Sequence, residues 1–403
     1  MDSAVAITGT GIICPMGNGA STVWENWMDG TGAMDKLCEE WSATLKTSLV
    51  ARCKHLPIEL EPHLLRRLDR CTQLAMAATQ QAWGECGKPE INPERLGVAI
   101  SSGIGGLETI HNGTIELEQK KILRVNPYIL PMAMPNSAAG QISIMMNASG
   151  DISTPNSACA GGAEAIAIGA QWINEGHVDM AIAGGCEALI NKLGVCAFES
   201  LGALSPNSTN QPQPFGLNRN GFVLGEGAGA LVLENGQHAI DRGACILGWI
   251  LGWGSSADAY HLVASRPDGV NAKRAIEKAI RKAGLELEDI SLIKAHATGT
   301  KTGDLAEARV LSEIWGNVSN KPTVIAPKSE IGHCISASGP IELIMALSCL
   351  KHGVAPGQSH DYELDPILKL PFAAKNTEIK GNIGLCNSFG FGGKNQALII
   401  KAA

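Results

Sequence analysis

The sequence predicts an α/β protein built from two related halves. Short apolar runs that suit buried strands, such as Val5–Cys14 and Leu96–Ser102, alternate with stretches of helical periodicity. Glycine is abundant (47 residues) and aromatic residues make up only 4%, which suits tight strand-to-helix turns. The alternation then begins again near residue 246 and continues to the C-terminus. Because strands that alternate with helices favour parallel pairing, we expect mostly parallel sheets covered by helices.

In the N-terminal half, assigned to residues 1–240, we expect strands at Val5–Cys14, Leu96–Ser102, Val178–Ala183 and in two segments of Gly221–Glu234. The helices expected there are Ala20–Asp29, His63–Trp83, Leu107–Glu118 and Gly140–Ala148. The glycine loop Gly103–Gly106 lacks the lysine and the spacing of phosphate-binding motifs, so a tight turn is favoured. Ser205–Asn220 is rich in Pro, Asn and Gln, which predicts a loop over a functional site.

In the C-terminal half, assigned to residues 241–403, the expected strands are Ile246–Trp253, Ile290–Ala295, Thr323–Ala326, Gly381–Asn387 and Gln396–Lys401. The expected helices are Ala272–Ala283, Asp304–Trp315 and Ile341–Lys351. The order of elements is similar to that of the first half, which supports two α/β halves packed together.

Composition narrows the possible functions. A net charge of −7 argues against general nucleic-acid binding. The N-terminus has no basic stretch followed by a long apolar run, and no apolar run is long enough for a membrane span. Twelve cysteines without a signal peptide predict reduced thiols and a cytoplasmic location. Without CxxC pairs or Cys/His clusters, we expect no metal site.

Cys159 lies where a β-rich run turns into an apolar helix, with Ala163, Ile166 and Ala167 at helical spacing behind it. The first N–H groups of a helix are unpaired and its dipole is positive there, so we expect a lowered thiol pKa and a stronger nucleophile. One cysteine among twelve is more often a buried structural residue. Partners elsewhere in the chain therefore have to decide.

Two histidines supply such partners. His296 follows the expected strand Ile290–Ala295, and His333 follows Thr323–Ala326. Because strand C-terminal ends line the functional crevice of α/β folds, we expect both histidines near one site. Lys328 adds a cation five residues before His333, and Glu342 on the next helix can pair with it.

These residues lie in motifs that resemble the β-ketoacyl-acyl-carrier-protein synthases, above all the type II elongating enzymes and their polyketide-synthase relatives. The motifs are SACAGG at Cys159, KAHATGTKTGD at His296, KSEIGH at Lys328 and His333, and NSFGFGGKN from Asn387. PFGLNRNGFVLGEGAG and SSADAYH belong to the same pattern, which runs from about residue 3 to residue 400. The resemblance implies a thiolase-like fold with two halves in five layers (α-β-α-β-α), and a dimer.

The resemblance also implies roles. Cys159 would accept an acyl chain from the phosphopantetheine arm of an acyl carrier protein, with no cofactor of its own. His296 and His333 would stabilise the enolate formed when malonyl loses CO2. The N–H groups of Cys159 and Phe391 would form the oxyanion hole, with Phe391 also a gate. Glycines would let that backbone approach closely: Gly390, Gly392 and Gly393. Lys328 and Glu342 would be a supporting ion pair.

Some positions depart from the family pattern. Gly216 and Asn220 stand where the family commonly has aspartates, and Ser205–Asn207 lacks a basic residue that some elongating enzymes use for carrier docking. Docking would then depend on basic residues elsewhere, through steering of an acidic carrier: Arg66, Arg67, Lys120, Lys121 and Arg124. These changes suggest a specialised synthase that forms a homodimer or pairs with a second ketosynthase-like chain.

Four alternatives compete with this interpretation. A thiolase needs a second catalytic cysteine near the C-terminal GFGG, and Cys386 lies a few residues earlier in a strand-like run. An initiating synthase with a Cys/His/Asn triad is disfavoured because KSEIGH supplies a histidine, His333. A non-catalytic chain-length subunit would have lost Cys159. A scaffold protein would leave Cys159, His296 and His333 unexplained.

Overall fold

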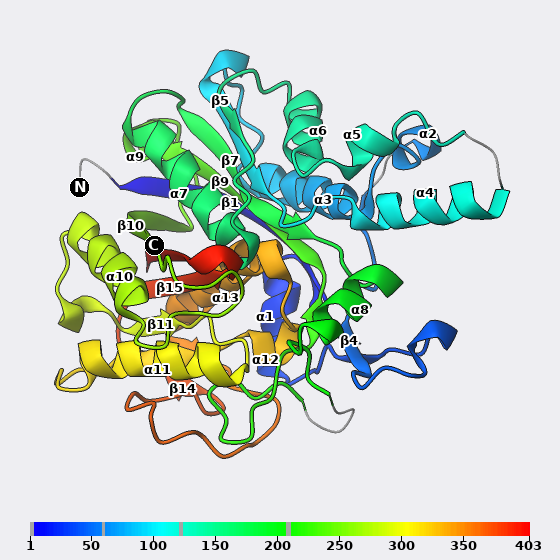
Figure 1. The fold of residues 1–403 in the computed structure, drawn as a ribbon. Coiled ribbons are helices and arrows are strands. Elements are labelled where there is room, and N and C mark those ends of the chain that lie inside the picture. Colours follow the sequence, from blue (N-terminus) through cyan, green and yellow to red (C-terminus); the bar gives the residue numbers. More distant parts are fainter. Residues whose placement is uncertain (1–3, 59–60, 121–123, 207–210) are drawn as a thin grey trace.

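A single mixed sheet organises the computed structural model, which describes residues 4–58, 61–120, 124–206 and 211–403 (Figure 1). Ten of its eleven strands follow the order β12 (Thr323–Ile325), β11 (Leu292–Lys294), β15 (Ile383–Gly390), β16 (Lys394–Ala402), β10 (Gly248–Ala257), β1 (Val5–Cys14), β9 (Gly227–Asn235), β7 (Met180–Glu187), β5 (Leu96–Ser101) and β6 (Ile152–Ser153). The eleventh, β2 (Gly17–Asn18), pairs with β1.

The two halves of this sheet, one on each side of the β1–β10 pair, repeat one pairing pattern. From β1 outward, β1–β9 and β9–β7 are antiparallel, whereas β7–β5 and β5–β6 are parallel. From β10 outward, β10–β16 and β16–β15 are antiparallel, whereas β15–β11 and β11–β12 are parallel. The duplicated α/β topology is thus present, but the expectation of mostly parallel sheets is wrong. The alternation of strands and helices along the sequence does not predict strand direction. The central strands β9 and β16 run antiparallel to both of their neighbours.

The β1 half and the β10 half of the sheet form two layers. Helices form three more, one between these halves and one outside each, which gives five layers in all. The outer helix α3 (Arg70–Glu85) packs on β1 and β9, and α10 (Val270–Ala283) packs on β10 and β16. The middle layer holds α7 (Gly161–Asn174) and α13 (Ser338–His352), which contact each other and both sides of the sheet. The thiolase-like arrangement expected from the family resemblance is therefore confirmed.

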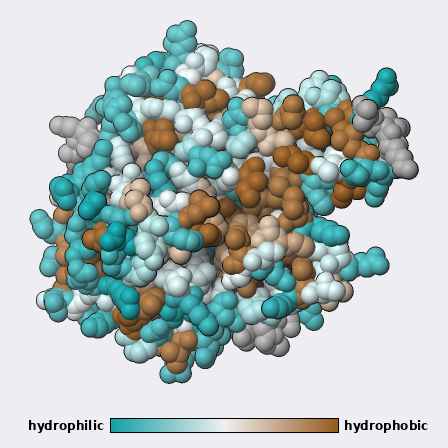
Figure 2. Space-filling view, viewed as in Figure 1, coloured by the Kyte–Doolittle hydropathy of each residue, from teal (hydrophilic) through white to brown (hydrophobic). Residues whose placement is uncertain are grey.

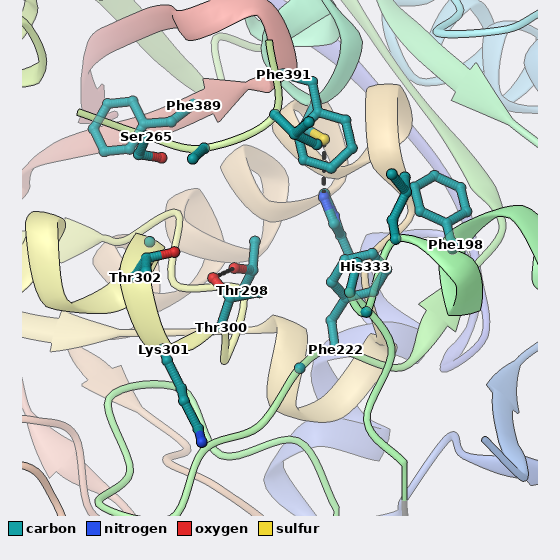
Figure 3. A pocket seen from close by; sticks show the side chains of 18 of the residues that line it. Phe198, Phe222, Ser265, Thr298, Thr300, Lys301, Thr302, His333, Phe389 and Phe391 are labelled. Atoms are coloured by element: carbon teal, nitrogen blue, oxygen red, sulfur yellow. Dashed lines mark hydrogen bonds between the residues drawn. The ribbon is translucent and has the colours of Figure 1, made fainter. Parts of the chain in front are cut away.

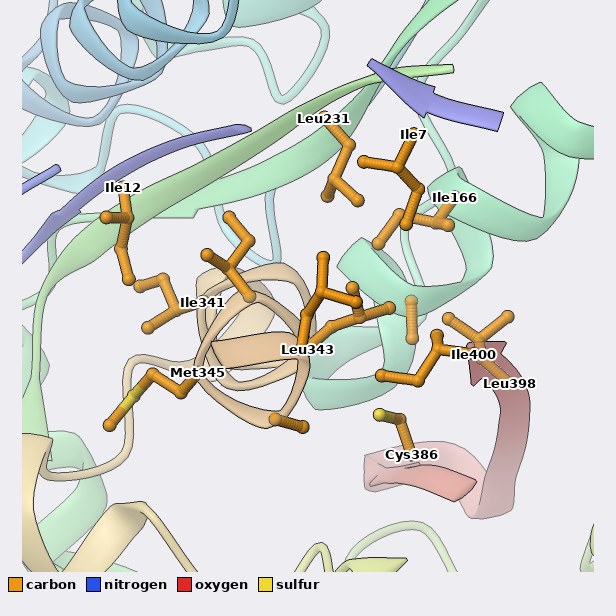
Figure 4. Packing of buried hydrophobic residues seen from close by; sticks show 14 of the residues in the cluster. Ile7, Ile12, Ile166, Leu231, Ile341, Leu343, Met345, Cys386, Leu398 and Ile400 are labelled. Atoms are coloured by element: carbon orange, nitrogen blue, oxygen red, sulfur yellow. The ribbon is translucent and has the colours of Figure 1, made fainter. Parts of the chain in front are cut away.

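The main core lies around α13 in the middle layer (Figure 4). Ile341 and Leu343 of α13 are fully buried among Ile166 of α7, Leu231 of β9 and Ile400 of β16. Burial of each such aliphatic side chain stabilises the fold by about 1.5–3 kcal/mol. Because α13 belongs to the second half but packs on β9 of the first, this core joins the halves.

The remaining α-helices and strands are α1 (Ala20–Met28), β3 (Asp35–Lys36), β4 (Leu49–Ala51), α2 (Pro62–Leu65), α4 (Leu107–Lys120), α5 (Ile129–Ala133), α6 (Ser137–Met146), α8 (Lys192–Ser200), β8 (Leu224–Gly225), α9 (Gly236–Asp241), α11 (Lys301–Trp315), α12 (Lys328–Ile331), β13 (Val354–Ala355) and β14 (Thr377–Glu378). The expected helix His63–Trp83 is divided, because Asp69 caps α3 by accepting from the Cys71 N–H. No described helix is both long and apolar enough to cross a membrane. The division of the chain at residue 240 stays a prediction.

Candidate active site

Cys159 lies in a single 3-10 turn, Ala158–Ala160, directly before α7. Two glycines of the first helical turn allow close packing at this point. A Cβ atom on Gly161 would lie 2.1 Å from Ser101 Oγ, and one on Gly162 would lie 2.3 Å from the Ser336 carbonyl oxygen. The predicted position of Cys159 at a helix N-terminus is therefore correct, and the small residues after it seat the helix beneath the thiol.

His333 points directly at Cys159. Its Nε2 lies 3.1 Å from the Cys159 sulfur, and its Nδ1 lies 3.0 Å from the hydroxyl oxygen of Ser338 (Figure 3). The backbone N–H of His333 donates to the backbone carbonyl of Val223 at 2.8 Å. His333 does not follow a strand directly, as the sequence suggested, because the short helix α12 lies between β12 and this residue.

His296 lies beside His333. In the sequence it follows β11, and only Ala295 separates it from the last residue of that strand. The two rings are 5.6 Å apart and nearly perpendicular. The buried Glu307 carboxylate on α11 fixes the backbone here, accepting from His296 N–H at 2.9 Å and Ala297 N–H at 2.8 Å. The structure thus brings Cys159, His296 and His333 together.

Lys328 and Glu342 form the expected ion pair, with Lys328 Nζ 2.6 Å from Glu342 Oε1. A second lysine shares the carboxylate, since Lys294 Nζ lies 3.0 Å from Glu342 Oε2 and also donates to the Asn387 carbonyl. All three charged side chains are buried. Lys294 is the first residue of the KAHATGTKTGD motif, but the sequence analysis did not single it out, because nothing local indicates that its side chain reaches Glu342.

The GFGG loop passes directly over the Cys159 turn. A Cβ atom on Gly390 would lie 2.4 Å from the Ser157 carbonyl oxygen and 3.3 Å from the Cys159 nitrogen. Gly392 and Gly393 adopt left-handed backbone conformations, with φ of 78° and 75°. The Phe391 and Cys159 N–H groups both interact with the sulfur, which lowers its pKa against the effect of burial. Two backbone donors therefore converge on the reacting atom.

The thiol pKa itself corrects a prediction. Burial raises the pKa of Cys159 to about 12, although Lys328 and the two backbone N–H groups act in the opposite direction. We expected a lowered pKa from the helix N-terminus alone. Burial also pushes the pKa of His296 and of His333 well below the usual value, helped by the nearby positive charge of Lys328. Both imidazoles are therefore neutral at neutral pH.

A cavity of about 550 Å³ opens onto these groups (Figure 3). Phe198, Phe222, Phe389 and Phe391 give it apolar walls, and hydroxyls of Thr298, Thr300 and Thr302 line another side. Pro206 and Asn220, at the two ends of the predicted loop, also line it. The cavity thus combines an apolar compartment beside the thiol with a polar approach, which suits a substrate with an acyl chain and an amide-rich arm.

The glycine loop Gly103–Gly106 has a structural explanation. Its Gly103 and Ile104 N–H groups donate to the buried Glu187 carboxylate at 2.8 and 3.3 Å. Burial raises the pKa of Glu187 to about 7, against the lowering effect of these donors. The loop therefore serves an internal carboxylate, which confirms the tight turn and not a phosphate cradle.

The positions that depart from the family pattern lie near side-chain contacts of their own. Arg219, three residues after Gly216, pairs with the distant Asp365, with Nη1 2.9 Å from Oδ2. Asn220 accepts a hydrogen bond from Ser205 Oγ at 3.0 Å at the cavity wall. Cys386 is buried in β15 within the main core, so it is no second catalytic cysteine. Of the described cysteines, Cys159 alone lines the cavity.

Of the residues expected to dock a carrier, Arg66, Arg67 and Arg124 do not line the cavity. Arg66 and Arg67 are exposed between α2 and α3, and Arg67 lies over the Tyr128 ring at 4.5 Å. Lys120 ends α4 and Arg124 is exposed beyond it, whereas Lys121 lies outside the described residues. A docking role for this group stays a prediction.

Comparisons with known proteins agree with the geometry. Residues 2–239 match the family model of the β-ketoacyl synthase N-terminal domain, and residues 247–361 match that of the C-terminal domain. The 3-oxoacyl-[acyl-carrier-protein] synthase 2 of Staphylococcus aureus (strain COL) is 36% identical, over 98% of both chains. That of Rhizobium meliloti (strain 1021) is 34% identical, again over 98% of both chains.

Solved structures give the same picture. The ishigamide ketosynthase/chain length factor matches with a TM-score of 0.91 and 27% identity over 100% of both chains. A type II polyketide acyl-carrier protein in complex with its ketosynthase, bound to the hexaketide, matches with a TM-score of 0.91 and 25% identity over 100% of both chains. Since both family models and near-complete relatives match, this chain belongs to the β-ketoacyl synthase family.

Proposed function

We propose that this chain is a β-ketoacyl-acyl-carrier-protein synthase, which condenses a Cys159-bound acyl chain with a malonyl thioester. The observation that carries the proposal is the 3.1 Å approach of His333 Nε2 to the Cys159 sulfur, with His296 beside it in the same cavity. A nucleophile with two neutral imidazoles suits decarboxylation, because neutral N–H groups can bind the carbonyl oxygen that becomes the enolate.

The first step moves the acyl chain to the enzyme. The Cys159 sulfur attacks the carbonyl of an acyl thioester, and the Phe391 and Cys159 N–H groups bind the oxyanion. The bond to the carrier's thiol breaks, and that thiol leaves with the proton that Cys159 loses. Apolar walls at Phe198 and Phe222 fit the acyl chain that remains.

The second step extends the chain. The bond between the malonyl α-carbon and its carboxylate breaks, CO2 leaves, and the electron pair forms an enolate held by His296 and His333. The α-carbon then attacks the Cys159 thioester carbonyl, and the carbon–sulfur bond breaks. The product is a β-ketoacyl thioester two carbons longer, and the Cys159 thiolate takes up a proton.

An acyl carrier protein is the proposed donor of both substrates. The curated relatives are named for acyl-carrier-protein substrates, and one structural neighbour is a ketosynthase in complex with such a carrier. The Thr298, Thr300 and Thr302 hydroxyls give the cavity a polar side for a phosphopantetheine arm. That arm is the only prosthetic group the reaction requires, and it belongs to the carrier.

A second ketosynthase-like chain is the proposed structural partner. Apolar side chains gather around α4 and α5 on the surface (Figure 2), and Leu130 and Met134 are 71% and 50% exposed. The short strand β6 at the edge of the sheet leaves Ile152 54% exposed. Patches of this kind mark protein interfaces. Because a structural neighbour is a ketosynthase/chain length factor, a heterodimer is proposed beside the homodimer.

The proposal is tested by intact-protein mass spectrometry. The protein is incubated with acyl-carrier protein and then with malonyl-carrier protein. We expect an acyl adduct that disappears with release of CO2 and a carrier-bound product two carbons longer. The Cys159→Ala variant should form no adduct, whereas Cys386→Ala should behave like the wild type.

The same measurement separates the two assemblies. If the purified chain forms no adduct but gains one with a co-expressed chain-length-factor-like partner, the heterodimer is supported. If no adduct forms with either preparation and any acyl length, the assignment of Cys159 as the acyl carrier is wrong.

A further inference from the structure

The two ring nitrogens of His333 have different partners, and this difference has chemical consequences. Nε2 faces the Cys159 sulfur at 3.1 Å, and Nδ1 faces the Ser338 hydroxyl at 3.0 Å. A neutral imidazole carries one N–H, and its position is set by the hydrogen bond at the other nitrogen. The partner of Nδ1 therefore decides whether Nε2 presents a proton or a lone pair to the sulfur.

Ser338 has one bond in which it must act as the acceptor. The Cys334 N–H donates to Ser338 Oγ at 3.0 Å. The hydroxyl's own proton still needs an acceptor, and Ser338 is only 1% exposed, so water does not supply one. Within the described part of the chain, His333 Nδ1 is the only other group in hydrogen-bond contact with this hydroxyl. The Ser338 proton therefore points at Nδ1, and Nδ1 accepts it.

We propose that Ser338 is a positioning residue that holds His333 as the tautomer with its proton on Nε2, facing Cys159 and the incoming thioester. The inference rests on the proposed condensation for its purpose, but the tautomer itself does not depend on it. In this state His333 is a hydrogen-bond donor to the substrate oxygen and to the Cys159 thiolate. It is not a base for the thiol, because its nitrogen beside the sulfur already carries a proton.

The local backbone explains why a serine reaches this nitrogen. Ser338 is the first residue of α13, and the chain turns back between His333 and Ser338 through a 3-10 turn, Ile335–Ala337. Ile335 adopts a left-handed conformation with φ of 46°. The turn thus brings the hydroxyl under the imidazole and lets one side chain hold both the Cys334 N–H and the ring.

The tautomer can be read from the ¹⁵N chemical shifts of the His333 ring in histidine-labelled protein, assigned with His333→Gln. We expect the wild type to show a protonated Nε2 and an unprotonated Nδ1, and Ser338→Ala to show a mixture. A wild-type spectrum with the proton on Nδ1 would overturn the inference, whatever the stability of the variants.

Kinetics give a second test. Malonyl-carrier decarboxylation by Cys159→Ala protein reports on the histidine pair without condensation. Adding Ser338→Ala should lower kcat by about 10- to 100-fold, the effect seen when a residue that orients a metal-binding histidine is removed. KM should hardly change, and Ser338→Thr, which keeps the hydroxyl, should restore most of the rate.

Ser336→Ala is the matched control. Ser336 is a buried serine in the same turn, and its hydroxyl contacts Ser101 Oγ at 2.6 Å and not His333. It should leave the decarboxylation rate and the His333 spectrum unchanged. Equal losses in both serine variants would overturn the positioning role. If Cys159→Ala protein that keeps Ser338 shows no decarboxylation, the proposed function is contradicted. The wild-type spectrum would still determine which ring nitrogen of His333 carries the proton.

Discussion

At the scale of single residues, Cys159 shows two opposing effects on one pKa. A helix N-terminus stabilises a charge by about 0.3–1 kcal/mol, or less than one pKa unit. Burial costs several units, and for Cys159 it raises the pKa to about 12. The prediction of a low pKa failed because a sequence shows where a helix starts but not how deeply its first turn is buried. Cys159 is therefore mostly a thiol at neutral pH, and its thiolate forms during the reaction.

Alkylation of Cys159 tests this. Since the thiolate is the nucleophile and its pKa lies far above 8, the iodoacetamide rate at Cys159 should rise about tenfold per pH unit from pH 7 to 9. Labelling is followed by peptide mass spectrometry, with the exposed Cys245 as the internal reference. An alkylation rate at Cys159 that does not increase between pH 7 and pH 9 would contradict a raised pKa.

At the scale of elements, the reacting residues are held by a 3-10 turn at Ala158, a loop at Ala297 and a 3-10 turn at Ile335. Ala158, Ala297 and Ile335 have left-handed backbone conformations, with φ of 49°, 31° and 46°. Each lies within two residues of Cys159, His296 or His333. Such conformations cost roughly 1–2 kcal/mol each for residues other than glycine. The surrounding layers hold these turns in place, and the packing of α7, α11 and α13 thereby supports the site.

The approach of the GFGG loop to the Cys159 turn can be tested with two glycines. Gly390→Ala would place a Cβ atom against the Ser157 carbonyl oxygen, so the Phe391 N–H should move away from the sulfur. Loss of one such donor lowers kcat by about 100- to 1,000-fold. Gly392→Ala meets no atom within 4 Å and adds only backbone strain, so it is the control. Equal kcat values for the two variants would contradict this account.

The shared carboxylate of Glu342 makes a strong prediction for stability. Glu342→Gln leaves Lys294 and Lys328 buried without a counter-charge and should lower the free energy of unfolding by about 3–5 kcal/mol. Urea denaturation measures the change. Adding Lys294→Met to this variant should recover part of the loss. Glu313→Gln, which breaks the surface pair with Lys273, should cost less than about 1 kcal/mol. Similar losses in the two single variants would show that burial does not matter here.

At the scale of the whole molecule, much of the architecture could be predicted from the sequence. Strand and helix periodicity located most elements within a few residues, and the motifs identified the fold. The directions of β9 and β16 could not be predicted, because apolar strands look the same whichever way they run. The break before α3 was missed because the apolar pattern continues across Asp69.

The site was predicted only as far as motifs reach. Cys159, His296, His333, Lys328 and Glu342 meet as expected. The residues that orient them were not identified, although Lys294 and Asn387 lie within the quoted motifs, since all are polar side chains buried by tertiary packing: Lys294, Glu307, Ser338 and Asn387. Their partners lie in other elements, and pairing over such distances cannot be inferred from one sequence.

The buried carboxylate of Glu187 makes stability depend on pH. Its pKa is about 7 in the folded protein and 4.5 ordinarily, so the folded state holds a proton that the unfolded state releases. The free energy of unfolding contributed by this group is therefore full below pH 4.5 and is lost as pH rises through about 7. From pH 5.5 to 8 the loss is about 2 kcal/mol.

Urea denaturation of the wild type and Glu187→Gln at these two pH values isolates this contribution. The buried histidines have the opposite sign, because their lowered pKa values make stability fall below about pH 6.5. They are present in both proteins and cancel in the comparison. The wild type should lose about 2 kcal/mol more than the variant on going to pH 8, and equal losses would rule out Glu187 as the source.

The seam between β1 and β10 joins Val5–Ile7 to Gly248–Ile250 in antiparallel register. It makes the sheet continuous, while α13 crosses to the other half. A chain cut between the halves would expose both an open strand edge and the apolar face that α13 covers. Each fragment would then be prone to aggregation, whereas the two together could reassemble. We therefore expect the two halves to unfold together as one cooperative unit.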